Sequence, residues 1–138
     1  MSATIDPGRI PAMAPAPLVR HRDQTMPVDC PYGHVQRIVT GGEGGVANVH
    51  VVRVTEGKPH VHAGYHEVYY VLAGRGRMTL DGREHALRPG AVAVVPAGVA
   101  HALAAEPGET LEFVIFGTPP MPIDDDRARP RPPAPSAS

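Results

Sequence analysis

The stretch HVHAGYHE at residues 60–67 and the stretch PAGVAH at residues 96–101 together contain four groups that can bind one metal ion. In the first stretch, His60 and His62 are separated by one residue and Glu67 comes last, and the second stretch ends in His101. Around them, short runs rich in valine and tyrosine alternate with glycines and prolines. The first kind of residue favours strands and the second favours turns. We therefore expect a β-structure that brings the two stretches together.

The rest of the central region supports this expectation. No window shows a helical stripe of adequate length, and Asp81-Gly82 is the strongest hairpin signal. Eight or nine short strands at this spacing predict a closed barrel or a two-sheet sandwich, because open sheets leave unprotected edges. The fold class is thus predicted to be all-β. The expected strands are residues 36–40, 46–54, 60–62, 66–73, 75–80, 83–87, 91–95, 101–105 and 110–116.

The two ends of the chain differ from this centre in composition. Residues 1–27 and 118–138 hold most of the seventeen prolines and few large apolar side chains. Such segments bury too little surface to offset the entropy lost on ordering. We therefore expect one folded domain at residues 28–117, between a proline-rich N-terminal arm and a proline-rich C-terminal tail that are disordered or loosely attached.

Charge and cysteine content narrow the class of protein. The formal net charge is −1 with mixed signs, which argues against nucleic acid as a partner, because binding it needs a concentrated basic face. No apolar run reaches the roughly 20 residues that span a bilayer, and no signal-peptide pattern is present. Cys30 stands alone, so no intrachain disulfide is expected. These features predict a cytoplasmic protein without membrane or nucleic-acid partners.

Strand geometry favours a metal site in the two stretches. Side chains two residues apart on a strand point to the same face, so His60 and His62 can lie together. A turn at residues 63–64 would bring Glu67 beside them, and His101 follows a second turn. Three imidazoles and a carboxylate suit a first-row divalent ion and leave one or two coordination positions open. The alternative is a set of ordinary surface histidines.

The spacing of these residues resembles the two sequence motifs of the cupin superfamily. The first motif, G-x5-H-x-H-x3,4-E-x6-G, is matched by His60, His62, Glu67 and Gly74. The second motif, G-x5-P-x-G-x2-H-x3-N, is matched by Gly90, Pro96, Gly98 and His101. Two positions depart from the pattern, since Val54 replaces the opening glycine and Ala105 the closing asparagine. Neither position is a metal ligand in the family.

The resemblance implies a cupin-type jelly-roll β-barrel that binds one divalent transition metal ion through His60, His62, Glu67 and His101. The ion would be Fe, Mn, Ni, Co, Cu or Zn, because imidazole-rich sites accept all of these. It also implies an enzyme, a dioxygenase, isomerase or lyase, acting on a small oxygenated organic molecule. The alternative is a non-catalytic module that binds or senses a small ligand. By analogy with the family, we also expect a homodimer.

Strand alternation then nominates residues around the metal. If Glu67 points inward, Tyr69 does too, as a proton donor, an orienting group or a core tyrosine. Tyr65 would lie in the turn at the pocket mouth, where it could serve as a lid or a base. His66 is adjacent to Glu67 and should face away from the metal. His50 is expected to be near the site or merely packed, and Arg37 and Arg53 would bind an anionic substrate only if they point inward.

Overall fold

A computed structural model describes residues 15–30, 33–41, 43, 45–55 and 64–121. Within these ranges the protein is built from nine strands and one short 3-10 helix, η1 (Arg22–Gln24). The expected all-β fold is therefore confirmed. The strands are β1 (Val28–Cys30), β2 (Gly33–Val39), β3 (Asn48–Val54), β4 (His66–Ala73), β5 (Gly76–Leu80), β6 (Arg83–Leu87), β7 (Val92–Val95), β8 (His101–Ala105) and β9 (Leu111–Thr118).

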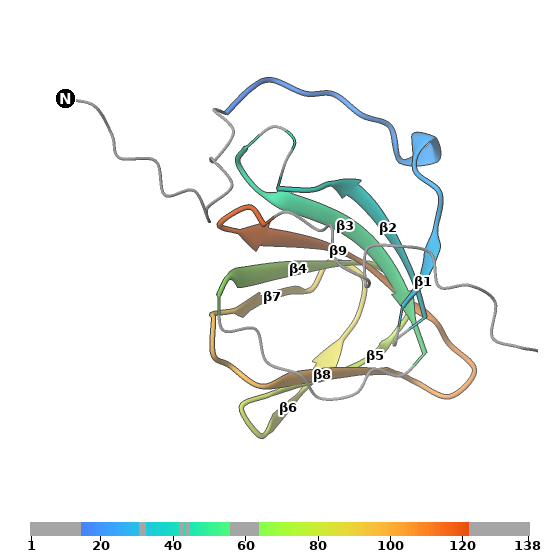
Figure 1. Ribbon diagram of the computed structural model, residues 1–138. Coiled ribbons are helices and arrows are strands. Elements are labelled where there is room, and N and C mark those ends of the chain that lie inside the picture. The colour runs from blue at the N-terminus through green and yellow to red at the C-terminus, as the bar shows by residue number, and fades with distance from the viewer. Residues whose placement is uncertain (1–14, 31–32, 42, 44, 56–63, 122–138) are drawn as a thin grey trace, which may run out of the picture.

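The strands form two antiparallel sheets that face each other as a jelly-roll barrel (Figure 1). The larger sheet has the order β1-β2-β3-β9-β4-β7, and the smaller has the order β6-β5-β8. A backbone hydrogen bond of 2.7 Å from the Ala105 amide to the Thr55 carbonyl ties the end of β8 to the end of β3. Strand β4, which carries the end of the first stretch, belongs to the larger sheet. Strand β8, which begins at His101, belongs to the smaller sheet that faces it.

Alternation along the strands decides which side chains fill the interior. On β4, Tyr69 and Val71 are buried in the core, whereas Tyr70 and Leu72 are exposed. The same rhythm places Phe113 of β9 inside, at 1% exposure. Period-2 burial of this kind is the signature of a sheet with one face on the core. The remaining core side chains are Val35, Val52, Val54, Met78, Leu87, Val95, Leu103 and Leu111.

The turns follow from residues that accept a positive φ. At the tip of the β5–β6 hairpin, Asp81 and Gly82 have φ values of 49° and 82°. Two successive positive values are what a type I′ hairpin turn requires, and Asp-Gly supplies them at low cost. This turn was predicted from the sequence. It sets the β5–β6 register that pairs Gly76 with Leu87.

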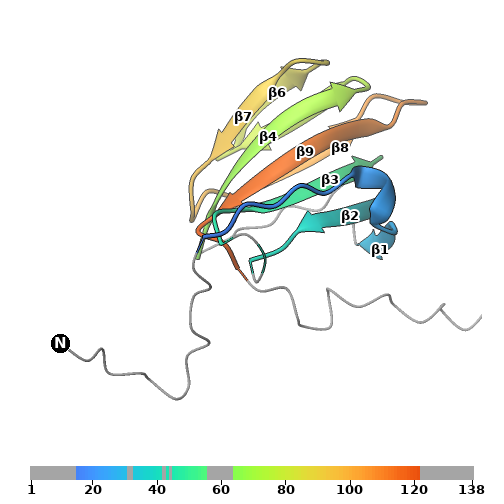
Figure 2. The ribbon, with the colours of Figure 1, turned by 90° about the horizontal axis from the view of Figure 1, so that it is seen from above.

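The segment before β1 runs across the outer face of the larger sheet, over β3 and toward β2 (Figure 2). Arg22 joins it to β9 through two hydrogen bonds to Glu112, of 2.9 and 3.3 Å. Arg20 pairs with Glu43 at 2.6 Å and donates to the Ile38 carbonyl. The described part of the N-terminal arm is therefore fixed by ion pairs. No helix among the described residues is long and apolar enough to cross a membrane.

Candidate metal centre

Glu67 lies on the inner face of the larger sheet, near the start of β4. Its neighbours across the sheet are Gly117 on β9 and Val95 on β7. The side chain is buried, at 6% exposure, which is unusual for a carboxylate because desolvation disfavours its charge. A buried carboxylate therefore needs hydrogen-bond donors or a cation beside it.

His101 is the first residue of β8 and is 2% exposed. Its Nδ1 lies 2.9 Å from the Val99 carbonyl oxygen, two residues earlier. A carbonyl can only accept a hydrogen bond, so Nδ1 carries the proton and Nε2 of the neutral ring presents its lone pair. A backbone carbonyl on the far nitrogen is the usual means by which proteins orient a metal-binding histidine.

The lone-pair side of His101 faces the carboxylate, with Nε2 3.4 Å from Glu67 Oε1. Two acceptor atoms at this distance repel each other unless a proton or a metal ion lies between them. Burial lowers the pKa of His101, but the contacts with Glu67 and the Val99 carbonyl raise it more, so it lies above its ordinary value. The pair therefore attracts a cation, and its donor atoms are those that first-row divalent metals prefer. Glu67 and His101 have the donor atoms of two ligands in such a metal site.

Tyr69 contacts both members of this pair. Its hydroxyl donates a 2.9 Å hydrogen bond to Glu67 Oε1. Its ring meets the His101 ring edge-on, with centroids 6.0 Å apart and an interplanar angle of 76°. Tyr69 is 3% exposed, so the geometry supports the orienting role among those considered.

The two residues before Glu67 take different positions. Tyr65 is half-buried, and its Cδ2 atom lies 3.8 Å from where a side chain at Gly117 would begin. Gly117 pairs with Glu67 across the sheet, so the Tyr65 ring lies near the same end of the interior. His66 is exposed, and its Nδ1 accepts a 2.9 Å hydrogen bond from the Ala97 amide. His66 thus faces away from Glu67 and braces the loop that precedes His101.

His50 and Arg37 extend the inner face of the sheet beyond Glu67 and Tyr69. Arg37 on β2 pairs with His50 on β3, which pairs with Ile115 on β9. Ile115 in turn pairs with Tyr69, so all four belong to one row across four strands. Burial lowers the pKa of His50 to about 4, aided by the Arg37 charge and opposed by that of Glu67.

Asn48 was not singled out from the sequence, although it shares the alternating face of His50. It is 5% exposed, and its Oδ1 accepts a 3.2 Å hydrogen bond from the Met121 amide. Met121 also accepts a hydrogen bond from the Gly41 amide through its carbonyl oxygen, at 2.9 Å. Asn48 therefore anchors the segment after β9, near Gly117 at the Glu67 end of the barrel.

His60 and His62, the other two predicted ligands, lie outside the described residues. Within the described part of the chain, no group of three histidine, cysteine, aspartate or glutamate side chains is placed to hold a metal ion. The structure therefore brings Glu67 and His101 together, and the four-residue ligand set stays a prediction.

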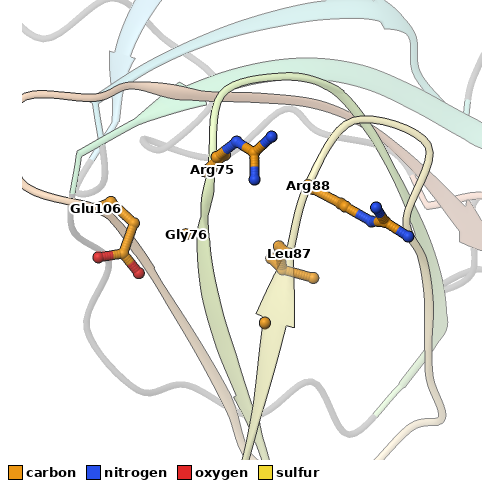
Figure 3. A pocket seen from close by; sticks show the side chains of 6 residues that line it. Arg75, Gly76, Leu87, Arg88 and Glu106 are labelled. Carbon is orange, nitrogen blue, oxygen red and sulfur yellow. The ribbon is translucent and has the colours of Figure 1, made fainter.

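A pocket at the other end of the smaller sheet is a separate feature (Figure 3). Arg75, Arg88 and Glu106 line it, together with Gly76 and Leu87. Gly76 pairs with Ala105, at the opposite end of β8 from His101. Arg75 and Arg88 are exposed to solvent, and water weakens the attraction between such charges and an anion. We therefore do not assign this pocket to the metal centre.

Comparisons with known proteins agree with the fold. A search of curated proteins found no match. Among solved structures, a protein from Planctomyces limnophilus has a TM-score of 0.67 at 26% identity, covering 80% of this chain and 95% of its own. Ectoine synthase from P. lautus has a TM-score of 0.67 at 16% identity, covering 75% and 79%. A predicted oxalate decarboxylase from Thermotoga maritima has a TM-score of 0.63 at 20% identity, covering 72% and 97%.

A family model described as the cupin domain matches residues 48–117, a little over half of the chain. The match begins at the first residue of β3 and ends within β9. It includes Glu67, His101 and the strands that carry them. Sequence motifs, sheet topology and family model thus agree, and the chain belongs to the cupin family.

Proposed function

We propose that this cupin is a metal-dependent enzyme, a dioxygenase, isomerase or lyase, acting on a small oxygenated organic molecule. The observation that carries the proposal is the buried pair of Glu67 and His101, whose Oε1 and Nε2 atoms face each other at 3.4 Å. Together with His60 and His62, they would hold one divalent transition metal ion in the barrel interior. Two structural neighbours, an ectoine synthase and a predicted oxalate decarboxylase, also favour an enzyme.

The metal would polarise substrate oxygens as a Lewis acid in its open coordination positions. Neighbouring residues of the chain orient the two ligand side chains Glu67 and His101. The Val99 carbonyl fixes the tautomer of His101, and the Tyr69 hydroxyl directs the Glu67 carboxylate. Tyr69 is thus proposed as a positioning residue, and Tyr65, near the same end of the interior, as the candidate proton donor or acceptor for the substrate.

The experiment is a cobalt titration of untagged, metal-stripped protein, read from the visible absorption of bound Co²⁺. One equivalent should bind the wild-type protein. Glu67→Gln and His101→Ala should each weaken binding at least about tenfold, because each removes a ligand. His85→Ala, on the exposed hairpin strand β6, is the matched control and should bind as wild type. Full occupancy in His101→Ala would contradict the ligand assignment.

Reaction class is then tested on the loaded protein. Oxygen uptake with candidate substrates would identify a dioxygenase, whereas product formation without oxygen uptake would identify an isomerase or lyase. Metal binding without turnover across a broad panel of small acids, sugars and aromatics would favour the alternative, a non-catalytic binding or sensing module.

We also propose that the protein is a homodimer that pairs through the outer face of β4 and β7. The described part of the N-terminal arm, residues 15–27, runs over the β2–β3 side of this sheet and does not extend over the β4–β7 side (Figure 2). The outward positions of β4 and β7 carry no acidic residue, lysine or arginine, as expected of an interface that meets its own copy. The large apolar side chains exposed there are Tyr70, Leu72, Val92 and Val94, beside Phe116 of β9.

A further inference from the structure

We infer that the substrate of this site is a small carboxylic acid whose carboxylate is bound by Arg37 in the barrel interior. The inference rests on the proposed metal enzyme and names the class of its substrate. The observation behind it is the direction of Arg37, which the sheet register turns toward the interior.

The direction follows from the neighbours of Arg37 on two strands. Val35 precedes it by two residues on β2 and belongs to the buried core, so both point to the inner face. Val35 pairs with Val52, and Arg37 pairs with His50, which keeps the same face on β3. The Nη1 atom of Arg37 is buried. A guanidinium cannot lose its proton in a protein, so this places a permanent positive charge inside the barrel.

Other arginines of the described chain differ from Arg37 in location. Arg53, on the neighbouring strand β3, is exposed on the outer face and lies 3.5 Å from Glu112. Arg20 and Arg22 pair with carboxylates beside the N-terminal arm. Exposed ion pairs of this kind are solvated and contribute little to stability. Arg37 instead lies in the row that leads across the sheet to Tyr69 and the metal centre.

His50 lies between Arg37 and Tyr69 in this row. Burial and the Arg37 charge together depress the pKa of His50 to about 4, so its imidazole is neutral at pH 7. His50 therefore adds no second positive charge beside Arg37. Its Nδ1 atom is buried and makes no hydrogen bond within the described residues. A ligand oxygen beside Arg37 lies in reach of a neutral imidazole rather than a second cation.

Charge counting then favours an anion over a neutral ligand. A divalent metal bound by Glu67 and neutral histidines would leave a net positive charge, and Arg37 is a further cation on the same inner face. The backbones of β2 and β4 are three strand spacings apart, about 14 Å, and Ile115 lies in the row between His50 and Tyr69. The arrangement suits an acid with its carboxylate at Arg37, a short apolar middle at Ile115 and an oxygen at the metal.

The test compares 4-oxopentanoate with its neutral methyl ester, both titrated into metal-free protein by NMR. The acid has a carboxylate and a ketone separated by two methylene groups. We expect the wild-type protein to prefer the acid at least about tenfold, because arginine–carboxylate bonds are charge-assisted. Arg37→Gln should abolish the preference, and Arg53→Gln, the matched change on the outer face, should retain it.

Equal binding of acid and ester, binding of neither, or a preference that survives in Arg37→Gln would overturn the inference. If Arg37→Gln fails to fold, Arg37→Lys serves in its place. It keeps the charge but loses the two-pronged contact, and should retain only part of the preference. Because these titrations use metal-free protein, they are independent of the cobalt titration. Loss of cobalt binding with an intact preference for the acid would refute the metal centre alone.

Discussion

His50 should make the stability of the metal-free protein fall as the pH drops below about 6.5. Burial, with the Arg37 charge, holds the pKa of His50 at about 4 in the folded protein, against an unfolded value of about 6.5. Because the folded pKa is depressed, the unfolded chain takes up the proton first as the pH falls. The neutral histidine therefore contributes stability above pH 6.5, and this contribution is lost as the pH falls toward 4.

The magnitude follows from the size of the shift. One pKa unit corresponds to about 1.4 kcal/mol, and the two states differ by about 2.5 units for His50. At pH 5, the unfolded histidine is almost fully protonated and the folded one is mostly neutral, so the loss is about 2 kcal/mol. At pH 4 it is about 3 kcal/mol. Losses of this size are a large fraction of the stability of a small domain.

The assay is urea unfolding by circular dichroism in excess chelator, for wild-type protein and His50→Gln at pH 7.5, 6 and 5. Comparing the two proteins cancels the carboxylates that they share. The wild-type protein should lose about 2 kcal/mol more than the variant between pH 7.5 and 5. His85→Gln, on the exposed strand β6, should behave as wild type. Parallel pH curves for the wild-type protein and His50→Gln would refute the reasoning.

Three further predictions concern the metal centre and the outer face. Tyr69→Phe should keep the fold but weaken Co²⁺ binding about tenfold in titration, because Glu67 loses the donor that directs it. Glu67→Gln should remove a contribution to stability whose pH dependence is opposite to that of His50. The pKa of His101 is raised, so its ion pair stabilises metal-free protein below about pH 6.5, and this is lost as the pH rises through the folded value. Urea unfolding of His50→Gln with and without Glu67→Gln measures this term. Val94→Glu should convert the dimer to monomer by light scattering at about 50 μM, whereas Val19→Glu, exposed on the arm, should not.

Much of the fold could be predicted from local pattern. Valine-rich alternation located β3, β4 and β7, and Asp81-Gly82 located the β5–β6 turn, because these signals act over a few residues. Strand β1 was not predicted, since its three residues are too few to show a period. It forms because β2 supplies an edge to pair with, and Val28 then packs against the core.

Glu67, Tyr69 and His101 could be singled out from the sequence, but the contacts among them could not. Alternation placed Glu67 and Tyr69 on one face, yet the hydrogen bond between them depends on rotamers that no pattern encodes. The Glu67–His101 contact joins two sheets, so its distance depends on how they pack. Arg37 was a candidate only if inward, and its direction depended on the β2–β3 register, which shifts immediately after it. Long-range register, not local propensity, decided that question.

The two inward histidines of the described chain lie beside side chains of opposite charge. His50 lies beside the cation Arg37 and its pKa falls, whereas His101 lies beside the anion Glu67 and its pKa rises. Burial is the largest cause of the fall at His50, whereas at His101 the contacts with Glu67 and the Val99 carbonyl outweigh burial. Arg37 and Glu67 thus place a positive and a negative side chain at different positions of the inner face. A metal ion at Glu67 and a carboxylate at Arg37 would each pair with the side chain of opposite charge, and a bound acid would contact both.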